Sequence, residues 1–267
     1  MNVGEGGEFA LKMRLVRMRD EGLTINGEAI IDVGFDGEYE SIPNAIYEEA
    51  VIAASVEDKD KLVELGKRAG LSKAAPRDKA DVYINGVGYS VKCLAGANPA
   101  MVNHTHRVGF MRVCNCIGVD ISTLDSIIER YWELRTAGTI KEDVRTNDPY
   151  SPFKDYKEYL RPILEFFFFK GSGSGCSVHQ AEYLLDYVDP FDESTWRIID
   201  KDDAIDEFWD YLVFSVRSKG MPEKDENIRP EMKKWTRFCD GSYKGSLHIR
   251  VDKKLESRSS SKRNRSP

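Results

Sequence analysis

The sequence lacks any long apolar run, because no stretch approaches 18 consecutive apolar residues. A membrane-spanning helix needs about 18 or more. The opening residues, MNVGEGGEFALK, also lack the basic region and apolar segment of a secretory signal. We therefore expect no membrane span, no export signal and a cytoplasmic location.

Cysteine is scarce, and its spacing is irregular. The five cysteines stand at positions 93, 114, 116, 176 and 239, an odd number that does not suggest a disulfide framework, so we expect reduced thiols. A pair of histidines, His104 and His106, precedes Cys114 and Cys116, but this spacing does not match a structural zinc site.

Charge is unevenly distributed along the chain. The net charge is −6, yet the Ser-rich tail from Lys253 holds six Lys or Arg and one Glu, so the tail carries +5 and the rest −11. We expect residues 253–267 to be a disordered basic tail, which either contacts nucleic acid or is simply solvated. Any DNA must meet a local basic surface, because the body is acidic.

Periodicity and stop signals predict helices over 43–56, 58–70, 120–138 and 201–220, and a last strand over 246–251. We expect 96–107 to be a polar loop and 155–169 to begin as a helix and continue as a helix or a buried strand. No linker interrupts residues 1–252, so we predict one domain. Helices around a short sheet indicate an α/β class, with α+β as the alternative.

The stretch DVYINGVGYSVK, residues 81–92, is the strongest hairpin signal. Asn85-Gly86 suits a two-residue type I′ turn, which sets Ile84 opposite Val87. Cross-strand partners share a face, so Asp81, Ser90 and Lys92 should gather on one face, with Gly88 leaving room between them. The other face should be the core face, with Val82, Ile84, Val87, Tyr89 and Val91.

Two interpretations of this hairpin stay open from the pattern alone. It can be an ordinary two-faced hairpin with its polar side in water. It can also be a phosphodiesterase site, because a carboxylate on a strand can hold Mg²⁺ and a nearby lysine can activate water or offset phosphate charge.

A resemblance favours the second interpretation. Asp81 followed by Ser90-Val91-Lys92 resembles the PD-(D/E)xK nuclease motif, and GYSVKCLAGANPAMVNHTHRVGF is similar to the hairpin-and-loop segment of several type II restriction endonucleases. FFFFKGSGSGCSVHQAEYLLDYVDPFD, residues 166–192, resembles a Gly/Ser-rich segment of related endonucleases. Ser90 departs from the motif's acidic residue, and Ala80 stands where the motif has Pro.

The resemblance implies a restriction-endonuclease-like core, a short mixed sheet flanked by helices, and Mg²⁺ as the cofactor. Asp81 would bind the metal, Lys92 would be the catalytic lysine, and Ser90 would hold a metal-bound water. A glutamate on an N-terminal helix would complete the site. Glu48 is the first candidate for this acid, and Glu49 and Asp78 are the alternatives.

Several polar residues are candidates for DNA contact, with no basis for ranking them. The run Lys170-Gly-Ser-Gly-Ser-Gly lacks the order of a nucleotide-binding P-loop, so it is either a flexible loop or a segment that approaches phosphate. The candidates are Asn103, His104, Arg107, Lys170 and Ser172.

Together these features predict a Mg²⁺-dependent type II restriction endonuclease that cleaves double-stranded DNA at a short sequence, in a prokaryotic cytoplasm, and leave a homodimer open. The alternatives are another nuclease of this superfamily, for repair or for a DNA structure, and an inactive DNA-binding protein on the same fold.

Overall fold

A computed structural model describes residues 3–252, so the predicted tail of residues 253–267 lies outside the described residues. Contacts group the described chain into two compact units. The first unit takes residues 3–97 and 178–201, and the second takes 98–177 and 202–252. The chain passes between the units at three points, and no stretch of linker composition marks them. The prediction of one domain over 1–252 did not anticipate this grouping.

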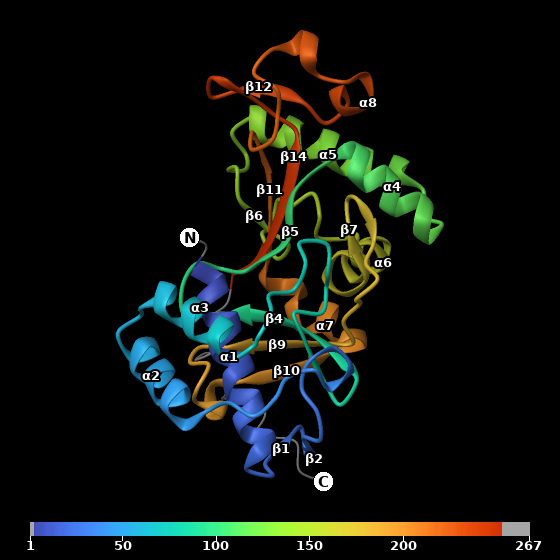
Figure 1. Ribbon diagram of the computed structural model, residues 1–267. Helices are drawn as coiled ribbons and strands as arrows, with labels where there is room; N and C mark the ends of the chain where they lie inside the picture. The colour runs from blue at the N-terminus through green and yellow to red at the C-terminus, as the bar shows by residue number, and fades with distance from the viewer. Residues whose placement is uncertain (1–2, 253–267) are drawn as a thin grey trace. The chain divides into compact units, whose positions relative to one another are not determined.

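The first unit is built on a short mixed sheet. Its strands are β3 (Val82–Ile84), β4 (Val87–Cys93), β9 (Tyr183–Tyr187) and β10 (Arg197–Asp200), in the order β10-β9-β4-β3. Strands β4 and β9 are parallel, and the other pairs are antiparallel. The helices of this unit are α1 (Val3–Asp20), α2 (Asn44–Ser55) and α3 (Lys59–Arg68), and a small hairpin joins β1 (Thr24–Ile25) to β2 (Glu28–Ala29) (Figure 1).

The predicted hairpin register is confirmed. Ile84 pairs with Val87, Tyr83 with Gly88 and Val82 with Tyr89. Asn85 and Gly86 both have positive φ, at 53° and 74°, as a type I′ turn requires. One face of the sheet lies in a core shared with α1, α2 and α3, and its buried strand residues are Val82, Ile84, Tyr89, Leu185 and Tyr187.

The second unit contains an antiparallel sheet in the order β5-β14-β11-β6. These strands are β5 (Ala100–His106), β14 (Ser246–Val251), β11 (Leu212–Arg217) and β6 (Val144–Arg145). The helices are α4 (Arg107–Ile117), α5 (Ile121–Thr136), α6 (Lys157–Glu165), α7 (Lys201–Phe208) and α8 (Pro230–Lys233). Two small hairpins pair β7 (Gly171–Ser172) with β8 (Gly175–Cys176) and β12 (Arg237–Cys239) with β13 (Ser242–Lys244).

Local patterns predicted α2, α3, α5 and β14 correctly, but two segments differ, and the structure resolves the alternatives for a third. The predicted helix over 201–220 ends at Phe208, and Leu212–Arg217 is a central strand. Residues 212–216 are buried and, apart from Ser215, apolar, and a short apolar run does not distinguish a helix from a strand. Part of the predicted loop 96–107 is strand β5, and α6 continues as a π-helical turn over Phe166–Lys170, not as a strand.

The fold is mixed α/β, with several small sheets and helices. Among residues 3–252, none of the helices combines the length and the apolar character needed to cross a bilayer.

Candidate functional site

Asp81, Ser90 and Lys92 contact one another, as the hairpin register predicted. Lys92 Nζ donates to Ser90 Oγ at 3.0 Å and lies 3.8 Å from Asp81 Oδ2. Ser90 Oγ in turn donates to Asp81 Oδ2 at 3.4 Å. The serine hydroxyl therefore links the lysine to the carboxylate.

Asp81 directly precedes the first residue of β3, and its hydrogen bonds to β4 set its position. The backbone N–H of Asp81 donates to Tyr89 O on β4 at 2.8 Å. Two residues further along β4, the Val91 N–H donates to the Asp81 carboxylate at 2.6 Å. The side chain thus satisfies a backbone donor that the short partner strand leaves free. These contacts involve Oδ2, while Oδ1 takes part in none of the hydrogen bonds or ion pairs found among the described residues.

Ser90 is buried, with 2% of its surface exposed. Its hydroxyl is already engaged by Lys92 and Asp81. The geometry therefore fits a residue that positions the lysine and the carboxylate, and its expected contact with a metal-bound water stays a prediction.

Gly88 does not leave an open space between these groups. A Cβ atom at this position would lie 2.4 Å from the carbonyl oxygen of Gln180 and 2.9 Å from Ala80 Cβ. The expectation of free room was wrong, because the backbone at Gln180 fills it. Glycine is needed here for the close approach of two chain segments.

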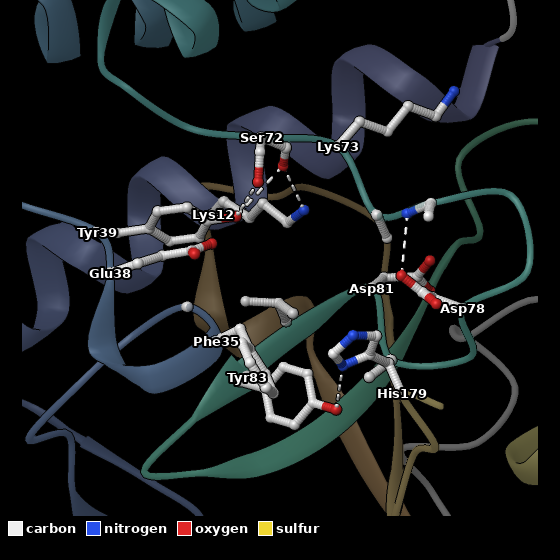
Figure 2. A pocket seen from close by; sticks show the side chains of 15 residues that line it. Lys12, Phe35, Glu38, Tyr39, Ser72, Lys73, Asp78, Asp81, Tyr83 and His179 are labelled. Carbon is white, nitrogen blue, oxygen red and sulfur yellow. Dashed lines mark hydrogen bonds between the residues drawn. The ribbon is translucent and has the colours of Figure 1, made fainter. Parts of the chain in front are cut away.

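A pocket of about 290 Å³ opens beside Asp81. Figure 2 draws Asp78 and Asp81 on one side of it and Glu38 and Tyr39 on the other. An aromatic group also lines the pocket: the Tyr83 hydroxyl is 3.1 Å from His179 Nδ1, and the Phe35 ring meets both rings edge-on. The pocket thus combines carboxylates with flat apolar surfaces.

Two lysines bring positive charge to the pocket. Lys12 is 1% exposed and donates to Glu8 at 2.7 Å and to Ser72 O at 2.9 Å, while Lys73 lies 3.1 Å from Glu5. Both pocket lysines are therefore paired with glutamates of α1, and α1 supports this side of the site.

Lys79 is a further residue of the site that the sequence did not single out as functional. Burial, followed by the charge of Lys92, lowers the pKa of Lys79 to about 8, while Asp81 raises it. The amines of Lys79 and Lys92 and the carboxylate of Asp81 are therefore electrostatically coupled. A lysine two residues before the motif aspartate was the available signal.

Two acidic residues near the site were also missed. Asp186 on β9 pairs in register with Lys92, so the two residues share a face of the sheet, and its buried carboxylate is 2.7 Å from Arg197. A lone acid in the apolar run YLLDYV was a usable signal. Glu8 lies on α1, which the sequence did not predict as a helix. Burial and then Cys93 are the largest causes that raise the pKa of Tyr187, and the charges of Glu8 and Asp81 raise it further.

The glutamates proposed as the second acid lie elsewhere. Glu48 is exposed on α2 and is neither a lining residue of the pocket nor a contact of Asp81. Glu49 faces Lys61 at 3.6 Å and Arg68 at 3.8 Å. The apolar stripe of α2 packs on α1 and α3, which turns both glutamates outward. Asp78, the remaining alternative, does line the pocket.

The site has a donor set suited to a hard cation that keeps its waters. No group of three His, Cys, Asp or Glu able to hold a metal occurs within residues 3–252. Mg²⁺ usually takes only one or two protein carboxylates and several waters. Asp81, with 23% of its side chain exposed and Oδ1 unengaged among the described contacts, fits that requirement, and Asp78 is the nearby second carboxylate.

The residues predicted to contact DNA belong to the second unit, and two of them are engaged internally. Arg107 forms a two-pronged ion pair with the buried Asp125, at 2.7 Å for both Nε–Oδ1 and Nη2–Oδ2. His104 stacks on His248 with ring centroids 4.4 Å apart, and burial together with Lys219 and Arg217 lowers the pKa of His104. Arg107 is thus held in an internal ion pair, and burial disfavours the charged form of the His104 ring. Their contact with DNA stays a prediction.

The other three candidates are more accessible. Asn103 and Lys170 are exposed, and Ser172 is half-buried, with its hydroxyl accepting from the Ser174 N–H at 3.2 Å. Lys170 and Ser172 stand at the start of the β7–β8 hairpin, so the Gly/Ser-rich run is a short ordered hairpin. These three residues keep the predicted role open.

No protein-family model, no curated protein and no solved structure matches the chain.

Proposed function

We propose that this protein is a Mg²⁺-dependent endonuclease of double-stranded DNA, of the type II restriction class. One observation carries the proposal: Asp81, which lines a pocket and directly precedes β3, lies 3.8 Å from Lys92 on the paired strand β4, and Ser90 joins the two side chains. A carboxylate can hold the metal in metal-assisted phosphodiester hydrolysis, and an amine beside it can offset the developing negative charge.

The surrounding sheet supports the same proposal. The carboxylate precedes β3, the lysine lies on the antiparallel strand β4, and the next strand, β9, runs parallel to β4. Helices α1, α2 and α3 share a core with this sheet. A short mixed sheet flanked by helices is what the PD-(D/E)xK resemblance implies.

Each residue has a defined part in the proposed reaction. Asp81, with Asp78 as the second carboxylate, would hold Mg²⁺, and the ion would supply Lewis-acid chemistry. Lys92 donates toward the scissile phosphate or its attacking water and offsets developing charge. Ser90 keeps both groups in place through its hydrogen bonds.

Two specific observations favour a second candidate, a DNA-binding protein without catalysis. Ser90 stands where the resemblance has an acid, and Glu48 does not line the pocket. With fewer carboxylates at the hairpin, metal binding would be weaker, and a gel shift without cleavage would be the expected behaviour.

Incubating the purified chain with unmethylated plasmid and genomic DNA distinguishes these functions. We expect discrete fragments with Mg²⁺, and no fragments with EDTA. A smear would indicate a nuclease without sequence preference. Intact DNA with a gel shift would indicate a binding protein, and intact DNA without a shift would overturn the proposal.

A further inference from the structure

Cys116 and Cys176 bring two thiols together on the surface of the second unit. Their sulfur atoms are 3.4 Å apart, although the residues are 60 positions apart in the sequence. Both side chains are exposed, whereas Cys114 is buried, and Cys93 and Cys239 are intermediate. Of the five cysteines, these two therefore combine exposure with a neighbouring thiol.

The two thiols belong to an ordered contact between α4 and the β7–β8 hairpin. A Cβ atom on Gly109 would lie 3.1 Å from Gly173 Cα, and Arg112 Nη1 donates to Gly173 O at 2.6 Å. Cys116 follows one turn after Arg112 on the same helix face. Gly109, Arg112 and Cys116, three and four residues apart along α4, thus all contact the hairpin, and the thiol pair is the last of these contacts.

This contact favours a covalent bond between the sulfurs. A disulfide needs the sulfur atoms about 2.05 Å apart, so these two atoms, now 3.4 Å apart, have to approach by little more than about 1 Å. Gly175, next to Cys176, has a φ of 132°, and Cys176 lies at the end of a two-residue strand. Cys176 therefore lies beside a glycine in a short hairpin, and both thiols are on the surface, where the side chains can move toward each other.

We infer that Cys116 and Cys176 are a reversible thiol–disulfide site that reacts with small disulfides such as oxidised glutathione. One cysteine thiolate attacks a glutathione sulfur, the glutathione S–S bond breaks, and a glutathione thiolate leaves. The second cysteine thiolate attacks the mixed disulfide, a second glutathione leaves, and the intramolecular disulfide forms. The two cysteines are oxidised, one glutathione disulfide is reduced, and the two protons end on the two glutathione thiols.

The exposure of both cysteines makes the bond reversible, because an accessible disulfide is open to attack by reducing thiols. The contact with Cys176 raises the pKa of the Cys116 thiol. Since the thiolate is the attacking form, the exchange should accelerate as the pH rises above neutrality. The bond would tie the β7–β8 hairpin to α4, and this inference does not depend on the proposed nuclease activity.

The test uses the full chain equilibrated in glutathione redox buffers, acid-quenched, treated with N-ethylmaleimide and analysed by intact and peptide mass spectrometry. We expect wild-type protein in oxidising buffer to lose two alkylated thiols per chain, with a peptide linking residues 116 and 176, and to regain both with dithiothreitol. Cys116→Ser and Cys176→Ser should each keep one glutathione adduct and form no internal link. Cys239→Ser, the matched control, should form the link like wild type.

Absence of the link in every buffer, a link that involves another cysteine, or only intermolecular dimers would overturn the inference. Hydrogen exchange adds a readout that a chance cross-link in unfolded chains would not give. Amides over 173–176 should exchange more slowly in the oxidised than in the reduced wild-type protein, while those of Cys239→Ser should behave like wild type. Equal exchange rates in the two states would contradict the proposed tie to α4.

Discussion

The two groups of residues that the sequence singled out differ in what their side chains contact. Asp81, Ser90 and Lys92 contact one another, and Asp81 lines a pocket. Arg107 and His104, from the predicted DNA-contacting group, are engaged by Asp125 and His248. The first group depends on the register of one hairpin, whereas the second depends on partners far along the chain.

This difference shows where a short sequence is informative. A two-residue turn determines which residues face each other a few positions away. It says nothing of whether an arginine has a buried carboxylate 18 residues away. The expected effects of substitution therefore differ in kind: changes in the first group should affect chemistry, and changes in the second should affect stability.

The largest effect is expected from Lys92→Ala. A positioned proton donor or acceptor contributes roughly 10²–10⁴-fold in rate, so single-turnover cleavage should fall by about that factor. Binding in Ca²⁺, measured by gel shift, should change little, because many phosphate contacts share the affinity. Lys67→Ala, an exposed lysine of α3 in the same unit, is the control, and an equal rate in both variants would remove Lys92 from the site.

Arg107→Ala should destabilise the fold. Its removal leaves the carboxylate of Asp125, which is 2% exposed, with only Lys234 and Trp235 as partners. Breaking a buried pair costs about 3–5 kcal/mol, and urea denaturation would measure it. Arg130→Ala should cost less than about 0.5 kcal/mol, because the Arg130–Glu133 pair is exposed. If Arg107→Ala keeps its stability but loses DNA affinity, the predicted DNA contact is restored.

Lys79→Met should make the protein more stable at pH 7 by about 1–2 kcal/mol. Because the pKa of Lys79 is lowered from 10.5 to about 8, the unfolded chain binds more protons between these values. Wild-type stability should therefore contain a component that rises with pH from 8 to 10.5. Denaturation curves across this range should show that the component disappears in the variant. A wild-type component that falls with pH would contradict this account of Lys79.

The smallest effect is expected from shortening the chain to end at Asp252. The six basic residues of the tail would contribute phosphate contacts, which give binding its salt dependence. The plot of log affinity against log salt should become less steep, while sequence preference stays unchanged. Identical slopes for the two chains would show that the tail does not contact DNA.

The parts of the fold predictable from sequence were those determined by near neighbours. The Asn85-Gly86 turn and the amphipathic helices α2 and α5 have such local signals. Strand β11 does not, because all but one of its residues are buried and its mostly apolar sequence fits a buried helix equally well. The division into two units depends on contacts between distant segments and has no local signal.

The site was predictable to the same extent. Asp81, Ser90 and Lys92 followed from one turn, and Gly88 was misjudged because the segment that approaches it, at Gln180, is remote in sequence. Glu8 and Asp186 come near the same hairpin from α1 and β9. Their approach is a product of tertiary packing, which no spacing within residues 81–92 could reveal.

The central claim is that the Asp81 carboxylate holds the metal on which DNA cleavage depends. Single-turnover cleavage by Asp81→Asn in Mg²⁺, beside Asp60→Asn as an exposed control on α3, tests it most directly. We expect at least about a 10²-fold loss for Asp81→Asn, with unchanged circular dichroism and a retained gel shift, and wild-type cleavage for Asp60→Asn. Near-normal, Mg²⁺-dependent cleavage by a folded Asp81→Asn protein would contradict the claim.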